Sequence, residues 1–285
     1  MTLPIPDETE FEAEMSRLRA AEAPFAVATV VRTLAATSAK PGAKALIDAA
    51  GTLRAGWLGG GCARTAIGRA ARAAIAERQP RFVSIRPEEL LEADGVTAGE
   101  EREGVHFARN GCPSKGSMDV FVEPVLPRPR LVICGTGPVA RALAGISARF
   151  GFHRVVCAPG TEAAAWPCVE EVVDGHAPDS AARFHVVATQ GMGDAPALRA
   201  AVASAADYVA FVGSRRKFAA LSERLAAEGA DRSALARVHA PAGLDIAAIT
   251  PDEIALSILA EIVAHRRTGD RTATTAPVPD PLPDR

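Results

Sequence analysis

Two cysteines in glycine-rich stretches are the residues of this sequence best suited to chemistry. Cys62 ends the run Gly59-Gly60-Gly61-Cys62, and Cys112 stands in the loop Asn110-Gly111-Cys112-Pro113-Ser114-Lys115-Gly116. Consecutive glycines permit backbone shapes that other residues avoid, or the close approach of a ligand. Lys115 supplies a cation three residues after Cys112, which favours a thiolate. Thiolates of this kind hold soft metal ions or cycle between dithiol and disulfide.

The alternative for Cys62 and Cys112 is that they are two unrelated, half-buried thiols. Five cysteines in 285 residues are too few for a disulfide scaffold. Cys134 and Cys157 end predicted buried strands, so packing is their expected role. None of the six histidines lies in a spacing typical of metal ligands, and we assign them no role, although a place for His239 beside a ligand cleft stays open.

A second stretch has the pattern of a phosphate-binding turn. The turn Gly135-Thr136-Gly137-Pro138-Val139-Ala140 directly follows the apolar strand 131–134. Gly135 permits the tight turn, Gly137 permits the close approach of a ligand, and Ala140 is the small third residue. The helix that follows presents free N–H groups and a partial positive charge to a phosphate. The stretch therefore predicts the first βα unit of a Rossmann-like domain.

Two later turns are expected at the same edge of that sheet. One is Thr189-Gln190-Gly191-Met192-Gly193-Asp194, and the other is Gly213-Ser214-Arg215-Arg216-Lys217. Open α/β sheets bind ligands at the carboxyl ends of their parallel strands. Backbone N–H groups combined with guanidinium groups favour phosphate or pyrophosphate, the alternative being a solvated basic helix turn. The candidate cofactor-binding residues here are Gln190, Gly191, Gly213, Ser214, Arg215 and Arg216.

Two domains are expected to position these residues, because a chain of 285 residues is long enough to bury two cores, and the predicted fold class is α/β. Residues 1–126 predict a smaller α+β domain, residues 130–267 the Rossmann-like parallel sheet, and residues 268–285 a disordered tail. Residues 124–129 contain three prolines and predict a stiff linker. In the first domain we expect helices at 7–22 and 63–78, strands at 25–34, 81–86 and 117–123, a hairpin of 43–48 with 53–58, and one short helix with a connection in 87–111.

The bulk composition excludes several classes of function. A net charge of −2 gives no electrostatic basis for binding nucleic acid or an anionic membrane. No apolar run reaches the roughly 20 residues of a membrane span, and the acidic N-terminus does not resemble a signal peptide, so a cytoplasmic location is expected. The second Rossmann strand ends in Cys157-Ala158-Pro159-Gly160. An acid that would hold the ribose of NAD is missing there.

Several motifs together resemble the XdhC/CoxF family of accessory proteins for molybdenum hydroxylases. They are PGAKALID, GWLGGGC, the Cys112 loop running into MDVFVEP, PRLVICGTGPVA, YVAFVGSRRK and GLDIAAITPDEIALSILAEIVA, and they span most of residues 25–267. The resemblance places the two motif cysteines of the family on Cys62 and Cys112. Departures after each cysteine, Ala63-Arg64 and Pro113-Ser114, look like the branch associated with carbon monoxide dehydrogenase.

The resemblance implies a chaperone, rather than an enzyme, that binds the molybdenum cofactor as molybdopterin cytosine dinucleotide and helps to mature and insert it. Its pyrophosphate would lie over the Gly135 turn, and its molybdenum would face Cys62 and Cys112, which could also accept Cu(I) or relay sulfur. The implied partners are an apo molybdenum hydroxylase, other maturation proteins and a second copy of this chain. Two alternatives stay open: a nucleotide-dependent oxidoreductase with a redox-active cysteine pair, and an assembly scaffold with a vestigial nucleotide fold.

Overall fold

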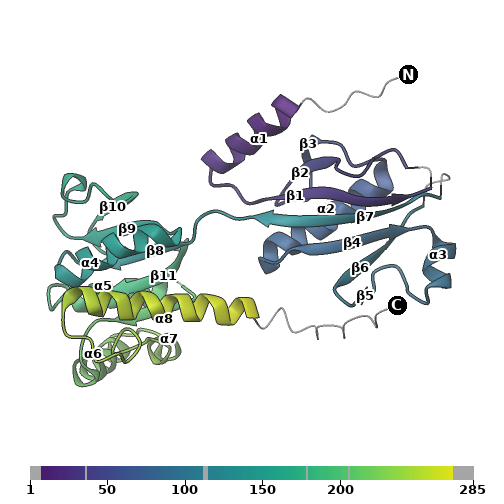
Figure 1. Cartoon of the computed structure of the whole chain (residues 1–285). Coiled ribbons are helices and arrows are strands. Elements are labelled where there is room, and N and C mark those ends of the chain that lie inside the picture. Colours follow the sequence, from purple (N-terminus) through teal and green to yellow (C-terminus); the bar gives the residue numbers. More distant parts are fainter. Residues whose placement is uncertain (1–7, 36, 112–114, 178, 205, 272–285) are drawn as a thin grey trace, which may run out of the picture. The chain divides into compact units, whose positions relative to one another are not determined.

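The computed structural model describes residues 8–35, 37–111, 115–177, 179–204 and 206–271 (Figure 1). They form two compact units that divide after Pro127. None of the described helices combines the length and the hydropathy that a membrane span requires. Each unit is a sheet with helices packed against it, so the predicted mixed α/β fold class is confirmed.

The first unit is built on a seven-stranded sheet in the order β3-β2-β1-β7-β4-β6-β5. Neighbouring strands are antiparallel except β4 and β6, which are parallel. The strands are β1 (Phe25–Leu34), β2 (Lys44–Asp48), β3 (Leu53–Gly56), β4 (Arg81–Arg86), β5 (Glu101–Arg102), β6 (Val105–Arg109) and β7 (Ser117–Val125). The helices are α1 (Glu8–Ala20), α2 (Gly61–Glu77) and α3 (Glu88–Ala93).

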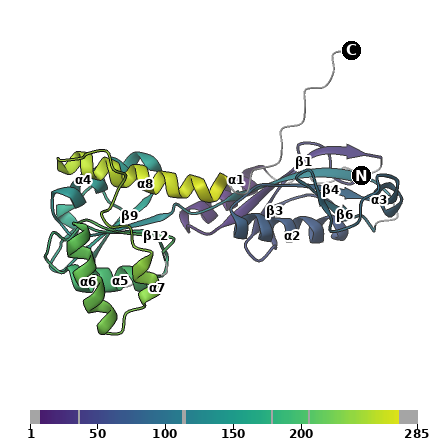
Figure 2. The same ribbon diagram turned by 90° about the horizontal axis from the view of Figure 1, so that it is seen from below.

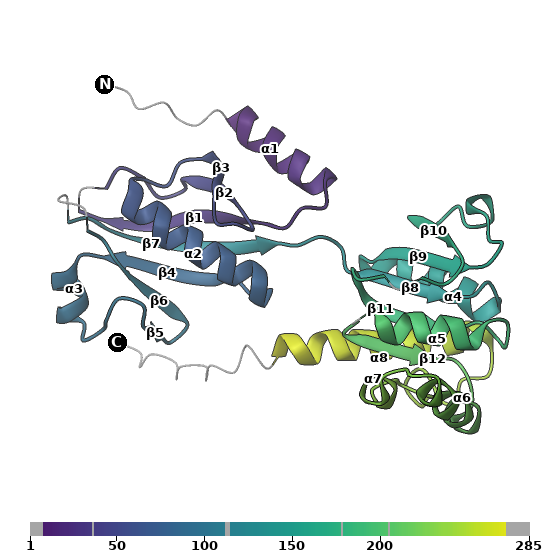
Figure 3. The same ribbon diagram turned by 180° about the vertical axis from the view of Figure 1, so that it is seen from behind.

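Alternate residues of β1 supply two separate cores. Ala26, Ala28 and Val30 face α2, which packs its alanine-rich side and Ile67 against the sheet (Figure 3). Phe25 faces the other way and packs with residues of α1. The two-residue period of a strand therefore explains how one β-strand supports helices on both faces.

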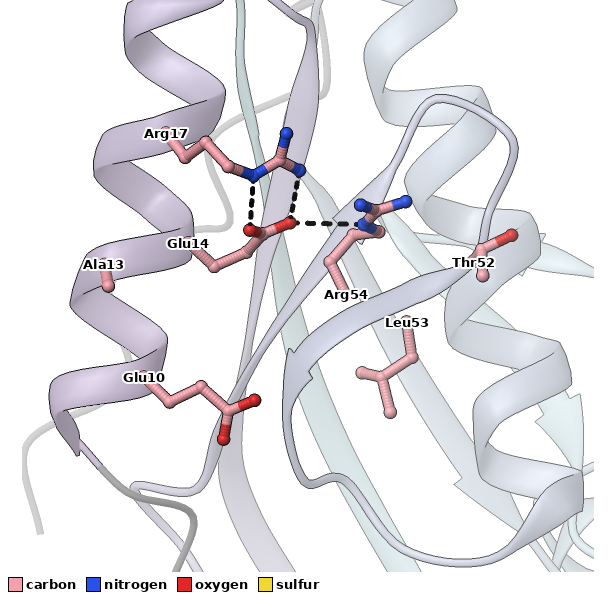
Figure 4. Close-up of a pocket in the computed structure, with 7 residues that line it drawn as sticks. All are labelled: Glu10, Ala13, Glu14, Arg17, Thr52, Leu53 and Arg54. Atoms are coloured by element: carbon pink, nitrogen blue, oxygen red, sulfur yellow. Dashed lines mark hydrogen bonds and ion pairs between the residues drawn. The ribbon is translucent and has the colours of Figure 1, made fainter.

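Helix α1 is also held by charge. Glu14 accepts hydrogen bonds from Arg17, at 2.7 Å, and from Arg54 of β3, at 3.2 Å (Figure 4). These hydrogen bonds lower the pKa of Glu14 to about 2. The three side chains line a pocket of about 450 Å³ between α1 and the β3 hairpin. They dock α1, and none of the predicted site residues lies in this pocket.

Two expectations about the first unit were wrong. Residues 87–111 contain not only the short helix α3 but also the strands β5 and β6. The linker was expected to begin at Pro124, yet β7 continues to Val125, with Pro124 opposite Ala26 of β1. Proline is tolerated there because the pairing of β7 with β4 ends at Val122, so no partner needs the missing N–H group.

The second unit is a five-stranded parallel sheet in the order β10-β9-β8-β11-β12. An additional parallel bridge joins Ala210 to His239, so the described part follows the strand order 3-2-1-4-5-6 of a Rossmann fold. The strands are β8 (Arg130–Cys134), β9 (His153–Ala158), β10 (Glu171–Asp174), β11 (Ala182–Val187) and β12 (Tyr208–Phe211). The helices are α4 (Pro138–Ile146), α5 (Asp194–Ala203), α6 (Arg215–Ala227), α7 (Arg232–Ala236) and α8 (Pro251–Arg271), with short 3-10 turns η1 (Ser147–Phe150) and η2 (Ala163–Ala165).

Helices cover both faces of this sheet (Figure 2). Helices α4 and α8 pack on one face around Leu143, Phe184 and Ile258, whereas α5, α6 and α7 cover the other around Leu198 and Phe211. Helix α8 runs to Arg271, so the first residues of the predicted tail are helical. The rest of that tail, residues 272–285, lies outside the described residues.

Candidate functional site

The glycine run of the first unit leads directly into α2. Gly59 is buried and has a φ of +104°, a conformation that other residues rarely adopt. Gly60 is the N-cap of α2, without a side-chain cap, and Gly61 is its first residue. Cys62 is therefore the second residue of the helix. The helix begins at Gly61, two residues before the predicted start at residue 63. Its thiol lies beside uncapped N–H groups, an environment that favours an anion.

Cys62 lies against the loop that carries the second predicted cysteine. A Cβ placed on Gly111 would lie 3.6 Å from Cys62 Sγ. Cys112 itself lies outside the described residues, but the residue before it, Gly111, lies close to Cys62. Cys62 also lines a pocket of about 340 Å³ between α2 and β6, with Arg69, His106 and Arg109 around it. Arg69 pairs with no carboxylate in the described part of the chain, which leaves its charge available to a ligand.

Lys115 pairs with Glu89 of α3 and lowers the pKa of that carboxyl group. Its ammonium group is thus engaged with a carboxylate beside the cysteine loop.

Sequence reasoning missed a buried acid a few residues further on. Asp119 is 5% exposed, accepts a hydrogen bond from Ser84 Oγ at 2.7 Å and pairs with Arg32 at 2.6 Å. Asp119 anchors the strand that follows the cysteine loop, and its only signal in the sequence is a charged residue within the predicted strand 117–123.

Replacing Gly59 with alanine is expected to lower the free energy of unfolding by about 1–3 kcal/mol, the usual cost of a residue held in a rare backbone conformation. The new methyl group would also lie 3.0 Å from Ser38 Oγ. Gly61→Ala is the matched control, because nothing lies within 4 Å of its Cβ and alanine favours a helix. Urea denaturation of both variants measures the difference. Equal stabilities would contradict the role assigned to Gly59.

In the second unit the Gly135 turn closes tightly on the neighbouring strand. Gly135 has a φ of +118°, and a Cβ on it would lie 2.4 Å from the carbonyl oxygen of Ala188. Gly137 is the N-cap of α4, again without a side-chain cap, and Pro138 occupies the first turn. Thr136 lies between the two glycines, half-buried. The first N–H groups of α4 therefore have no side-chain cap.

The loop after β11 lies next to this turn. A Cβ on Gly137 would lie 2.4 Å from Gln190 Oε1, so the Gln190 side chain covers the turn. Gln190 has a φ of +52°, which is uncommon outside glycine and marks a constrained position. Strands β8 and β11 are neighbours although β9 and β10 come between them in the chain. This reversal of strand order is the place where Rossmann sheets bind dinucleotides.

The third predicted turn has a divided role. Ser214 caps α6 by accepting a hydrogen bond from the N–H of Lys217. Lys217 pairs with Asp194 at 2.6 Å. Partial burial would raise the pKa of Asp194, but bonds from Lys217, Thr189 and the N–H of Gly191 lower it. Arg215 and Arg216 are exposed and pair with no carboxylate among the described residues, so these two remain candidates for phosphate.

Two further features of this unit were not predicted. Asp174, at the end of β10, accepts a hydrogen bond from the N–H of Gly160 at 2.7 Å, which brings a carboxylate into the loop after β9. Cys134, Cys157 and His185 form a buried cluster, although the sequence assigned packing to the cysteines and no role to the histidine. Their mutual hydrogen bond lowers the pKa of Cys157 and, with burial, raises that of Cys134.

The fold defines a Rossmann type of domain, preceded by a separate α/β unit that has a thiol at the start of a helix. Residues 131–262 match the XdhC Rossmann domain, and residues 18–86 match the XdhC and CoxI family. The chain therefore carries both of these XdhC-family domains.

One curated relative is the uncharacterized protein YqeB of Escherichia coli strain K12, with 31% identity over 270 residues. The match covers 88% of this chain and 45% of YqeB, so the chain spans about half the length of that relative. A solved structure titled as a xanthine dehydrogenase from Bacillus halodurans is 20% identical, with a TM-score of 0.44 over 93% of this chain and 97% of that chain.

Proposed function

We propose that this chain is an accessory protein of a molybdenum hydroxylase, which binds the molybdenum cofactor and assists its maturation and insertion. The observation that carries the proposal is the presence of both XdhC-family domains on one chain. The proposed ligand is molybdopterin cytosine dinucleotide, and the proposed client is of the carbon monoxide dehydrogenase type. A homodimer is the proposed assembly.

The second unit would hold the pyrophosphate of this ligand. The start of α4 has no side-chain cap, so its first N–H groups could bind the phosphates once the Gln190 side chain, which covers the turn, moves aside. Arg215 and Arg216 add two guanidinium groups that form no ion pair with the described residues. Charge-assisted bonds of this kind are about twice as strong as neutral ones. Backbone N–H groups and arginine side chains would therefore both bind the phosphates of the nucleotide.

The first unit would receive the molybdenum end. Cys62 supplies a thiol at the rim of a pocket of about 340 Å³, a volume within the range of small-molecule sites. Arg69 balances the negative charge of an oxo or sulfido group. Thiolates are soft ligands, which suits sulfur transfer or Cu(I) addition better than binding of hard cations. Cys112 is the proposed second thiol, and Gly111 beside Cys62 supports its proximity.

Co-expression of the full chain with a molybdenum hydroxylase tests this function. The purified wild-type chain should contain molybdenum and release CMP on acid hydrolysis. Cys62→Ser is expected to lose the metal but to keep the nucleotide. Arg215→Ala and Arg216→Ala should each weaken nucleotide binding about tenfold, the loss of one hydrogen bond to a charged group.

The matched control for Cys62→Ser is Cys168→Ser, since Cys168 is an exposed thiol to which no role is assigned. It should behave as the wild type. If a Cys62→Ser, Cys112→Ser double variant retains molybdenum and matures its client normally, the proposed role of the thiols is wrong.

A nucleotide-dependent oxidoreductase with a redox-active cysteine pair is the second candidate function, and Asp174 favours it. Its carboxylate lies in the loop after β9, where a ribose would need an acceptor, although it comes from β10. Fluorescence titration of the full chain with NADH, NADPH and FAD separates the two functions. Micromolar binding of any one of them would favour the oxidoreductase.

A further inference from the structure

We propose that the second unit contains a structural zinc site formed by Cys134, Cys157 and His185, with His176 as the fourth ligand. The site lies inside the Rossmann sheet, directly beneath the Gly135 turn. It is separate from Cys62 and Cys112 and does not depend on the function proposed above.

The three ligands come from three neighbouring strands. Cys134 of β8 is in register with Cys157 of β9, and His185 lies on β11 at the other side of β8. The two sulfur atoms are 2.9 Å apart, and His185 Nε2 is 3.1 Å from Cys134 Sγ. All three ligand atoms lie within 4.8 Å of one another, and all three residues are buried. Parallel pairing thus brings together residues far apart in sequence.

The sulfur separation is too long for a disulfide bond, which requires about 2.05 Å. In a tetrahedral site with Zn–S bonds of about 2.3 Å, two sulfur ligands lie about 3.8 Å apart. A change of about 1 Å, within reach of small χ1 rotations, would therefore admit the ion between Cys134 and Cys157. The thiols need no change of backbone to become ligands.

A neighbouring serine sets the tautomer that a metal ligand needs. Ser204 Oγ donates its hydrogen to the carbonyl oxygen of Ala201 at 2.6 Å. Because that hydrogen is already used, the contact between Ser204 Oγ and His185 Nδ1, at 3.4 Å, requires Nδ1–H to donate and the serine oxygen to accept. The lone pair of a neutral His185 is consequently on Nε2, the atom that faces the sulfur of Cys134. An outer hydrogen bond of this kind is the usual support of a metal-binding histidine.

His176 is the proposed fourth ligand, and its ring would have to move toward the other three, whose ligand atoms alone lie within 4.8 Å of one another. Both of its ring nitrogens are buried and have no hydrogen-bond partner among the residues that the structure describes. Buried polar atoms of this kind are uncommon without a ligand or water. His176 lies in the loop after β10, with Nε2 3.2 Å from the position of a Cβ on Gly193. Coordination of an ion beside Cys157 would satisfy this orphaned imidazole.

The charge of the set selects the ion. Two thiolates and two neutral imidazoles carry a charge of −2, which Zn²⁺ neutralises and Cu⁺ does not. An uncompensated charge is costly in the apolar surroundings of Val132, Val155 and Leu198. Four protein ligands without an open position are typical of structural rather than catalytic zinc.

The ion would stabilise the turn that receives the ligand. Cys134 immediately precedes Gly135, and the N–H of Gly135 donates to the carbonyl oxygen of Cys157 at 2.9 Å. Binding both cysteines to one ion fixes both sides of that hydrogen bond. Zinc is therefore expected to rigidify the carboxyl ends of β8 and β9.

Zinc analysis of the full chain tests this proposal. After incubation with Zn²⁺ and removal of free metal, elemental analysis should find about one zinc ion per chain in the wild type. The Cys62→Ser, Cys112→Ser double variant should keep this zinc, and so should Cys168→Ser. Cys134→Ser, Cys157→Ser and His185→Ala should lose it. Co²⁺ substitution should give a thiolate-to-cobalt charge-transfer band that the same variants abolish.

Ser204→Ala tests the site without removing a ligand. It should retain the native circular dichroism spectrum but bind Zn²⁺ about 10- to 100-fold more weakly, measured by competition with a chromophoric chelator. Three results would overturn the proposal: no zinc in the reconstituted wild type, zinc that is lost with Cys62 and Cys112 but not with Cys134, or a Cys134–Cys157 disulfide in mass spectra of the non-reduced chain.

Discussion

Gly135→Ala is expected to lower the free energy of unfolding of the second unit by about 2–6 kcal/mol and to abolish nucleotide binding. A φ of +118° costs a residue with a side chain about 1–3 kcal/mol. The added methyl group would also overlap the carbonyl oxygen of Ala188 at 2.4 Å, and relief of such an overlap costs a further 1–3 kcal/mol or so. Relief requires the turn to move away from β11, which removes the N–H groups from the ligand.

Gly145→Ala is the matched control for this variant. Gly145 is an exposed residue of the same helix region, and nothing lies within 4 Å of its Cβ. Alanine there should raise the stability by about 0.5–1 kcal/mol. Denaturant unfolding and nucleotide titration of both variants measure the two effects. A Gly135→Ala chain of unchanged stability would show that the turn does not close on Ala188 in solution.

Glu261→Ala is expected to cost about 1–3 kcal/mol, the loss typical of leaving a buried hydrogen-bond donor such as the Tyr208 hydroxyl without its partner. The carboxylate accepts hydrogen bonds from Tyr208 Oη at 2.6 Å and from the N–H of Gly243 at 2.8 Å, and it contacts His239 Nδ1 at 2.7 Å. Burial and the bond to Glu261 raise the pKa of Tyr208. Truncation therefore leaves several polar groups without partners inside the unit.

Thermal unfolding followed by circular dichroism measures this loss. Glu261→Gln should retain part of the stability, because its amide oxygen still accepts one hydrogen bond. Glu223→Ala removes a carboxylate of an exposed ion pair with Arg232 and should change the melting temperature little. A melting temperature of Glu261→Ala equal to that of Glu223→Ala would contradict the role of this network.

The sequence predicts those elements whose signal is local. The β-branched run that ends at Leu34 and the segment 81–86, with Phe82, Val83 and Ile85 between two arginines, give the bounds of β1 and β4 as observed. The residues Val105–Arg109 were not predicted as a strand, because only Phe107 is buried in β6 and the strand depends on pairing with β4. A pattern search within one segment does not detect such pairing.

The site residues also divide into those with a local signal in the sequence and those that depend on contacts between distant segments. Glycines with positive φ, such as Gly59 and Gly135, are visible in the sequence because a residue type reports a backbone conformation. The contacts of Lys217 with Asp194, and of Cys134 with His185, join residues 23 and 51 positions apart and depend on the strand order. Sequence spacing therefore identified the turns but not the side chains that surround them.

The position of α8 in the chain determines when the second unit can become complete. Ala255, Ile258 and Ile262 are fully buried beside α4, yet they follow every strand of the sheet in the sequence. During synthesis on the ribosome, the part of this face that α8 covers stays exposed to solvent until these residues emerge, so the second unit can complete its core only after the last part of the domain is made.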